Sequence, residues 1–187
     1  KSLAELLALA KARPQLFNFA MGGYGSATHL AVEQFRAASK IDIVVIPYKG
    51  GGLATADVLA GQVVMMFGGP SSIAQHVAGG RLRAVAVTGD KQNPALPKVP
   101  TFIEAGLPAV DAGSYWGSLA PAATPRDIVN TLSAAMVKSL QLPDVRQRLV
   151  ALGYEPLGST PEVFTANLRS EMSKWAAAAK TAKIRVE

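Results

Sequence analysis

Cysteine is absent from the 187-residue sequence, and histidine occurs only twice. Without cysteine there is no disulfide and no thiolate metal site, and two histidines among scattered carboxylates assemble no metal centre. Long apolar runs are lacking too: none approaches the ~18 residues of a membrane-spanning helix, and residues 63–67 have only the length of a strand. We therefore expect no metal, no cofactor and no direct insertion into a membrane.

A concentrated basic region is also missing. The formal net charge is +6, but the 19 lysines and arginines are spread along the chain, and the longest basic cluster is residues 81–83. We interpret this charge as a solvated surface that favours anionic ligands, and we expect no nucleic-acid partner. A basic nucleic-acid-binding module is a third hypothesis, and it predicts retention on DNA that falls steeply with salt.

Apolar residues make up 49% of the sequence, enough for a buried core in one large or two small domains. The first residues do not have the pattern of a signal peptide. The chain opens directly on a predicted helix, in which Ser2 and Glu5 form a capping box and Pro14 ends the helix. We expect that a leader or a longer N-terminal region has been removed.

The chain is arranged around a glycine turn at residues 21–30. Residues 16–20 predict a strand, three glycines follow within residues 22–25, and a helical pattern begins after Ser26. As N-cap, Ser26 would leave the free N–H groups of the next three residues at the positive end of the helix dipole. Because glycines let a ligand approach the main chain closely, the turn predicts a phosphate or carboxylate site.

Two further glycine turns, at residues 48–52 and 68–72, repeat this order of strand, turn and helix. The predicted strands are residues 16–20, 41–46, 63–67 and 82–87, and the predicted helices are residues 27–38, 53–59 and a third helix that ends at Gly79. The alternation indicates βαβ units and a parallel sheet. Ligands of such sheets lie at the carboxyl ends of the strands, where all three turns would meet.

The second half of the sequence is mainly helical. A capping box from Thr101 to Glu104 predicts a short helix, and residues 114–120 predict a strand. The helices expected after Pro121 are residues 125–140, 143–152 and 161–182. In the last of them, Phe164, Leu168, Met172 and Trp175 recur every three or four residues and predict a core-facing stripe.

Patterns for catalysis are weak. Residues 23–28 match the first two glycines of the dinucleotide fingerprint, but Thr28 stands where the third belongs, and no Walker pattern occurs. Ser26 is not in a Gly-x-Ser-x-Gly elbow, and His29 in the first helical turn is more simply a structural hydrogen-bonding group. We predict no catalytic residue and no enzyme. A nucleotide- or phosphate-using enzyme on a doubly wound α/β sheet is the alternative function.

Two aromatic residues have open interpretations. Tyr48 either offers its hydroxyl to an anion or packs at the end of a strand, and these interpretations are equally supported. Trp116 has a large apolar face that could stack on a ligand, although burial between domains is favoured. Lys49 beside Tyr48 is interpreted as a solvated side chain.

Ordered motifs along the whole chain resemble one known family. They are Gly23-Tyr24-Gly25-Ser26-Ala27-Thr28-His29-Leu30, Ile46-Pro47-Tyr48-Lys49-Gly50, Leu59-Ala60-Gly61-Gln62-Val63, Arg81-Leu82-Arg83-Ala84-Val85-Ala86-Val87-Thr88, Leu96-Pro97-Lys98-Val99-Pro100-Thr101, Glu104-Ala105-Gly106-Leu107-Pro108, Trp116-Gly117 and Leu119-Ala120-Pro121. Together they resemble the Bug family, the extracytoplasmic solute receptors of tripartite tricarboxylate transporters.

The resemblance implies a periplasmic-binding-protein-like α/β fold of the Venus-flytrap type, with no catalysis. Residues 1–112 would be the complete second α/β domain. Residues 113–187 would be the returning strand and C-terminal helices of the first domain, whose N-terminal part is missing. Family members bind small carboxylates, so the implied partners are such a ligand and membrane transporter subunits, and the implied location is the periplasm.

The resemblance also implies the ligand-binding residues. In the family a Gly-x-Gly-Ser loop holds a ligand carboxylate through main-chain N–H groups and hydroxyls, a role that falls here on Gly23, Gly25 and Ser26, with Tyr24 between them. The full set of expected ligand-binding residues is Met21, Gly22, Gly23, Tyr24, Gly25, Ser26, Thr28, His29, Tyr48 and Gly68. Met21 replaces a small hydroxyl residue, and Gly68 replaces an acidic residue that often follows the phenylalanine. Both changes favour a less polar ligand, such as an aromatic or alkyl carboxylate.

Overall fold

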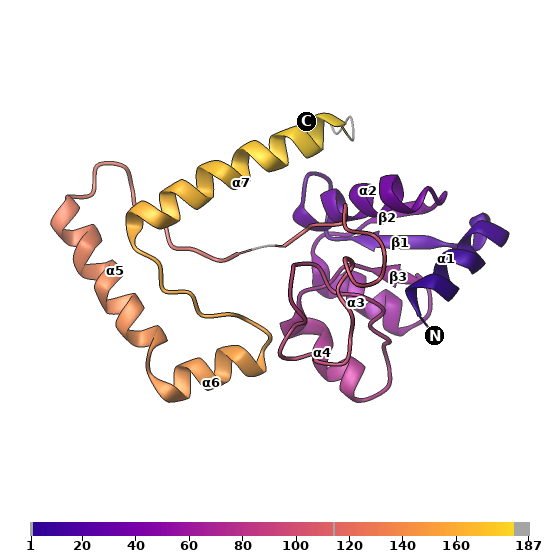
Figure 1. The fold of residues 1–187 in the computed structure, drawn as a ribbon, viewed down its shortest axis with the longest axis horizontal. Coiled ribbons are helices and arrows are strands. Elements are labelled where there is room, and N and C mark those ends of the chain that lie inside the picture. The colour runs from indigo at the N-terminus through magenta and orange to yellow at the C-terminus, as the bar shows by residue number, and fades with distance from the viewer. Residues whose placement is uncertain (1, 114, 182–187) are drawn as a thin grey trace.

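The computed structural model describes residues 2–113 and 115–181. Figure 1 shows two parts, which we call the α/β lobe (residues 2–113) and the helical arm (residues 115–181). The arm leaves the lobe as an extended segment, passes through two helices away from the lobe, and returns as a long helix whose end lies beside the lobe (Figure 1). The sequence-predicted change from alternating strands and helices to helices alone therefore coincides with the change from lobe to arm.

A three-stranded parallel sheet forms the centre of the α/β lobe, in the order β2-β1-β3. The central strand β1 (Asn18–Met21) pairs with β2 (Val44–Pro47) on one side and with β3 (Met65–Met66) on the other. In this register Phe19 lies opposite Val45 and Met65. Because all three strands run in the same direction, their carboxyl ends meet at one edge of the sheet, as the glycine turns predicted.

Helices surround this sheet in the described part of the lobe. They are α1 (Leu3–Ala12), the short 3-10 helix η1 (Pro14–Leu16), α2 (Ala27–Ser39), α3 (Gly51–Leu59) and α4 (Pro70–Ala78). The predicted capping box of α1 is confirmed: the Glu5 N–H donates to Ser2 Oγ over 3.2 Å, and the Ser2 N–H donates to Glu5 Oε2 over 3.3 Å. α2, α3 and α4 follow β1, β2 and β3 in turn, so the βα alternation is confirmed as well.

A cluster of phenylalanine rings fixes α2 on the sheet. Phe35 of α2 lies 5.9 Å from Phe19 of β1 and 5.9 Å from Phe102, measured between ring centroids. Phe67, which follows β3, stacks on Phe19 at 5.1 Å. Burying an aromatic side chain contributes about 1.5–3 kcal/mol, so this core determines where the first turn of α2 lies relative to the central strand.

Two predicted elements of the lobe are absent from the described residues. The strand expected over residues 82–87 does not form: Val85 and Ala86 pack against the core, but only Val87 makes a bridge, to Thr101. The main-chain N–H of Val87 donates to Pro100 O, so the extended chain bonds to a loop instead of to β3. The capping box of Thr101 and Glu104 does form, with N–H to oxygen distances of 2.8 and 3.1 Å, but it opens a series of turns and not a helix.

The helical arm contains α5 (Arg126–Leu140), α6 (Pro143–Ala151) and α7 (Pro161–Thr181). These bounds agree with the predicted helices to within one residue: Pro125 is the N-cap of α5, and α6 ends one residue earlier than predicted. Residue 182 of the last predicted helix lies outside the described residues. Ser114 of the predicted strand 114–120 lies outside the described residues, and residues 115–120 form no strand. A strand needs a neighbour to pair with, and the described chain offers none beside this segment.

The arm buries very little of its apolar surface. No residue of α5 or α6 is buried, and Trp116 and Leu119 of the extended segment are 82% and 78% exposed. The prediction that Phe164, Leu168, Met172 and Trp175 face a core is wrong for the described chain, because none of them is buried and Met172 is 64% exposed. These apolar faces have no counterpart in the described residues that could cover them.

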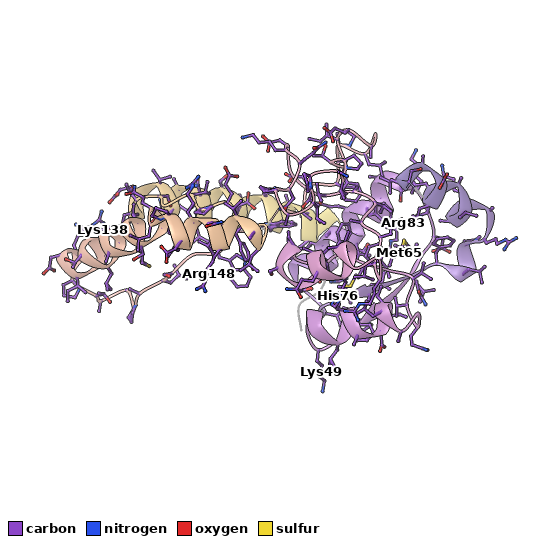
Figure 2. The ribbon with its side chains drawn as sticks, turned by 90° about the horizontal axis from the view of Figure 1, so that it is seen from below. Lys49, Met65, His76, Arg83, Lys138 and Arg148 are labelled. Carbon is purple, nitrogen blue, oxygen red and sulfur yellow. The ribbon has the colours of Figure 1, made fainter. Side chains whose placement is uncertain are left out.

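Basic residues occur on both parts of the molecule, as their spread along the sequence predicts. The labelled basic residues in Figure 2 lie far apart, with Lys49 on the lobe and Lys138 and Arg148 on the arm. Lys49 points away from the molecule and is exposed, in agreement with its interpretation as a solvated side chain. Among the described residues, no helix has the length and apolarity that crossing a membrane would require.

Candidate functional site

The glycine turn between β1 and α2 lies at the carboxyl end of the central strand. Gly23 and Gly25 have φ angles of +128° and +73°, a region that side chains with a Cβ rarely adopt. Ser26 is the N-cap of α2, as predicted, and the His29 N–H donates to its Oγ over 3.2 Å. The turn therefore brings the chain back on itself at the start of a 13-residue helix.

The hydroxyls of this turn are used within the turn. Ser26 Oγ donates to the carbonyl oxygen of Gly23 over 2.7 Å, which uses its single hydrogen. Thr28 Oγ1 accepts the Gly22 N–H over 2.8 Å and lies 2.9 Å from Ser26 Oγ, to which it donates because that oxygen's own hydrogen is already engaged. In this arrangement neither hydroxyl keeps a hydrogen for a ligand, and a ligand contact of Ser26 or Thr28 stays a prediction.

His29 is a structural group of the same turn. Its ring is 8% exposed, and Nδ1 accepts the main-chain N–H of Gly25 over 3.1 Å. An acceptor at Nδ1 is the neutral imidazole with its hydrogen on Nε2. The exposed ring of Tyr24 meets the His29 ring edge-on, with 5.5 Å between centroids. The imidazole therefore supports the loop, while Tyr24 stands at its surface.

Four main-chain N–H groups of the turn remain available. Those of Gly25 and Ser26 are engaged, the first by His29 and the second by the carbonyl of Gly23 over 3.3 Å. In the described chain the N–H groups of Gly23, Tyr24, Ala27 and Thr28 have no acceptor. Two amides before the cap and two after it are therefore free to donate, whereas the Gly25 and Ser26 amides hold the turn together.

Acidic residues are distributed unequally over the helix starts. The four described α-helices that begin elsewhere have an acid in the first turn, namely Glu5 in α1, Asp127 in α5, Asp144 in α6 and Glu162 in α7. The three that begin at the carboxyl edge of the sheet, α2, α3 and α4, have none. An acid in the first turn compensates the helix dipole. The dipoles that converge on this edge are thus left uncompensated, and an anion is the complementary ligand.

The second glycine turn adjoins the first. A Cβ built on Gly22 would lie 3.7 Å from the N of Gly51, the first residue of α3, so the two turns touch. α3 has no side-chain cap, and the N–H groups of Gly51, Gly52 and Leu53 have no acceptor among the described residues. Sequence reasoning missed these amides. The signal that could have found them is a helix start with glycine as N-cap and no acid in its first turn.

Tyr48 packs at the end of β2, and its hydroxyl donates to Asp57 Oδ2 over 2.7 Å. This hydrogen bond, together with burial and the charge of Asp57, raises the pKa of Tyr48 above the usual 10.0. Of the two open interpretations, packing at the strand end is therefore confirmed. In this arrangement Asp57 engages the hydroxyl hydrogen, and the expected ligand contact of Tyr48 stays a prediction.

Packing determines which atoms of two further expected ligand-binding residues, Met21 and Gly68, are accessible. Met21 is only 1% exposed because β1 carries its side chain into the core. A Cβ on Gly68 would lie 2.8 Å from Ile73 Cγ2 and 3.1 Å from Met66 Cε. The space in which a larger residue at position 68 would stand is therefore occupied by apolar side chains, and only the main chain of Gly68 is presented there.

A small cavity opens beside the start of α2. Its volume is about 270 Å³, and it lies between Ala27, the segment leaving the lobe, and α7. Its lining is largely apolar and consists of Ala27, Gly113, Tyr115, Leu168, Glu171, Met172 and Trp175. The carboxylate of Glu171 is occupied by Trp175, whose Nε1–H donates to it over 2.9 Å. An apolar surface thus adjoins the free amide of Ala27.

Several solved structures share the fold of this chain. A protein of R. palustris with adipate is 31% identical, with a TM-score of 0.89 over 98% of this chain and 61% of that one. The periplasmic binding protein BugD is 30% identical, with a TM-score of 0.90 over 100% of this chain and 63% of that one. MatC from Rhodopseudomonas palustris with bound malate is 27% identical, with a TM-score of 0.79 over 95% and 62%. The fold is therefore that of a periplasmic binding protein, present in part, as expected.

The family follows from the sequence comparison. The model of the tripartite tricarboxylate transporter family receptor matches residues 1–182, and the chain belongs to this family. A protein from the tcbD-tcbE intergenic region of Pseudomonas sp. strain P51 is 36% identical over 176 residues, 94% of this chain and 52% of that protein. BugT of Bordetella pertussis is 33% identical over 175 residues, which are 94% of this chain and 54% of that protein. The chain thus spans about half the length of these two relatives.

The predicted family, the Bug-type receptors of tripartite tricarboxylate transporters, is therefore confirmed. The nucleotide-using enzyme, kept as the alternative, finds no support in the family or in its solved structures. The described residues also contain no group of three or more potential metal ligands.

Proposed function

We propose that this chain forms one half of a receptor that captures a small organic carboxylate. The observation that carries the proposal is the set of four free main-chain N–H groups, at Gly23, Tyr24, Ala27 and Thr28, at a helix start without an acid. Hydrogen bonds from such donors to a carboxylate are charge-assisted and are worth about 1.5–3 kcal/mol each. The hydroxyls and the imidazole of the turn hold these donors in place before the ligand arrives.

The ligand class is an acid without an amino group and with an apolar body. Gly68 is closed in by Ile73 and Met66, so this position offers no carboxylate that would pair with an ammonium group. The cavity beside Ala27 adds an apolar surface next to one of the free amides. Among the relatives' ligands, adipate has four methylenes between its carboxylates, whereas malate carries a hydroxyl, and we expect an adipate-like acid to bind more tightly.

The division of the chain and its partners belong to the same proposal. Residues 1–112 form the second ligand-binding domain, and residues 113–187 supply the returning segment and C-terminal helices of the first. The exposed apolar faces of α5 and of residues 115–120 support this division, because the remaining half of the relatives' length would cover them. The receptor works in the periplasm and delivers its ligand to the membrane subunits of a tripartite transporter.

A thermal-shift screen tests the proposal. The protein is produced with the N-terminal half that its relatives carry, and mono- and dicarboxylic acids are added, including adipate, malate, benzoate and nicotinate, with aspartate and phosphate as comparison anions. A ligand at one hundred times its Kd stabilises the folded state by about 2.7 kcal/mol. We expect a shift in Tm with one or more of the acids without an amino group. The absence of a shift with every carboxylate would contradict the proposal.

A further inference from the structure

The helical arm touches the α/β lobe in two separate zones. In the first, Lys174 Nζ of α7 lies 2.6 Å from Asp111 Oδ2, and the Asp111 N–H donates to Gln34 Oε1 of α2 over 3.1 Å. In the second, the turn between α6 and α7, formed by Gly153 and Tyr154, meets the start of α4. Figure 1 shows α7 beside α2 and the α6–α7 connection beside α4, on opposite sides of the lobe.

The second zone depends on a glycine. Gly153 has a φ of +81°, and a Cβ there would lie 2.4 Å from Pro70 Cβ and 2.8 Å from Asn93 Oδ1. Its carbonyl oxygen accepts the side-chain N–H of Asn93 over 2.9 Å. Asn93 is oriented by its own loop, because its Oδ1 accepts the Ala95 N–H over 2.9 Å. The arm can come this close to the lobe only because position 153 has no side chain.

Tyr154 adds a second polar contact in this zone. Its hydroxyl lies 3.0 Å from the hydroxyl oxygen of Ser71, the second residue of α4 and 83 positions earlier in the chain. Both side chains are half-buried. Ser71 follows Gly68 at the carboxyl edge of the sheet, where the third glycine turn lies. The contact therefore joins the arm to the same edge that carries the free amides of the proposed ligand site.

We infer that Gly153 and Tyr154 form a latch that stabilises the closed arrangement of the receptor. The inference rests on the proposed function, in which the two domains close over the ligand. The lobe ends at Gly113, two residues after Asp111 of the first zone. Motion about this end of the lobe therefore separates the second zone most. The second zone consists of the hydrogen bonds from Asn93 to Gly153 and between Tyr154 and Ser71, and of the close approach of Gly153 to Pro70. These contacts form only when arm and lobe meet. Their strength therefore sets the population of the closed state without ligand.

Distance measurements between spin labels test the latch in the protein with its N-terminal half. These 187 residues contain no cysteine, and any cysteine of the N-terminal half is first replaced by serine. Gln75→Cys on α4 and Gln147→Cys on α6 then provide two unique labels at exposed positions. Without ligand, Tyr154→Phe, Ser71→Ala and Gly153→Ala should each increase the population with the longer distance. Gly158→Ala is the matched control: its φ is +64°, but its nearest contact is Val137 of the arm, at 3.5 Å, so the distances should not change.

Titration with adipate gives a second measurement. Loss of one neutral hydrogen bond from the closed state should weaken adipate binding by about 2- to 12-fold in Tyr154→Phe, and Gly158→Ala should bind as the parent does. One outcome is that the label distances change in Tyr154→Phe while no acid raises the Tm of the protein. This combination would support the latch and contradict the proposed function. Circular dichroism checks that each of the four variants is folded. If all four folded variants have the same label distances as the parent, the latch is overturned, whether or not an acid binds.

Discussion

The main-chain N–H of Gly25 donates to Nδ1 of the buried His29 over 3.1 Å, across four positions of the chain. This bond joins the glycine turn to the first turn of α2. With the Ser26 and Thr28 hydroxyls, it fixes the turn without using the amides of Gly23, Tyr24, Ala27 and Thr28. Side chains therefore shape the turn and the main chain presents the donors, an arrangement that lowers the cost of ordering the site on binding.

Removal of the Ser26 hydroxyl should affect stability and binding together. Ser26→Ala removes the N-cap of α2 and the bonds to Gly23 and Thr28, so we expect a loss of about 1–2 kcal/mol in the free energy of unfolding. Ligand affinity should fall as well, because the free amides lose their fixed positions. Chemical denaturation and calorimetry with the best acid of the screen measure the two effects.

Ser2→Ala is the matched control, since it removes the N-cap of α1 far from the site. It should cost a similar amount of stability and leave the Kd unchanged. If both serine variants lower affinity equally, the effect of Ser26 is one of general stability and the role given to its turn is wrong.

Tyr48 should matter at alkaline pH and not in ligand binding. Its pKa is raised in the folded state by the bond to Asp57, so its stabilising contribution is complete below pH 10, the pKa of an unperturbed tyrosine, and is lost as the pH rises through the raised value. Tyr48→Phe should therefore remove one component of the alkaline loss of stability, as measured by denaturation between pH 9 and 12. Its Kd at neutral pH should equal that of the parent; a large loss of affinity would show that the hydroxyl contacts the ligand.

Position 68 should tolerate no side chain unless the neighbouring side chain of Ile73 is made smaller. Gly68→Ala places a Cβ 2.8 Å from Ile73 Cγ2 and should destabilise the protein by about 1–3 kcal/mol. The double variant Gly68→Ala with Ile73→Ala should be more stable than the sum of the two single effects predicts. Strict additivity in denaturation experiments would mean that Ile73 does not close this position.

Local sequence signals predicted the parts of the fold that are locally determined. The caps at Ser2 and Ser26 were correct because a cap depends on residues within one helical turn. The strands expected at 82–87 and 114–120 were wrong because a strand depends on a partner elsewhere, and the same apolar residues pack without one.

The site was predicted only in outline, for the same reason. The sequence indicated an anion-binding turn, but which of its donors remain free depends on how the turn folds back on itself. That Gly22 bonds to Thr28, and Gly25 to His29, follows from the left-handed conformations of Gly23 and Gly25, which no spacing reveals. The burial of Met21 likewise follows from where β1 ends, which is one residue beyond the end of the predicted strand.

The Kd of Ala27→Pro, measured by calorimetry in the protein with its N-terminal half, tests the central claim most directly. Ala27 is exposed and is the first residue of α2, where proline is well tolerated, and Ser26 already has the extended backbone that precedes proline. The substitution removes one free N–H and little else, whereas Ala27→Ser keeps it. We predict an affinity about 10- to 150-fold weaker for the proline variant, with the serine variant unchanged. Equal affinities for parent, serine and proline variants would contradict capture of the ligand by these main-chain amides.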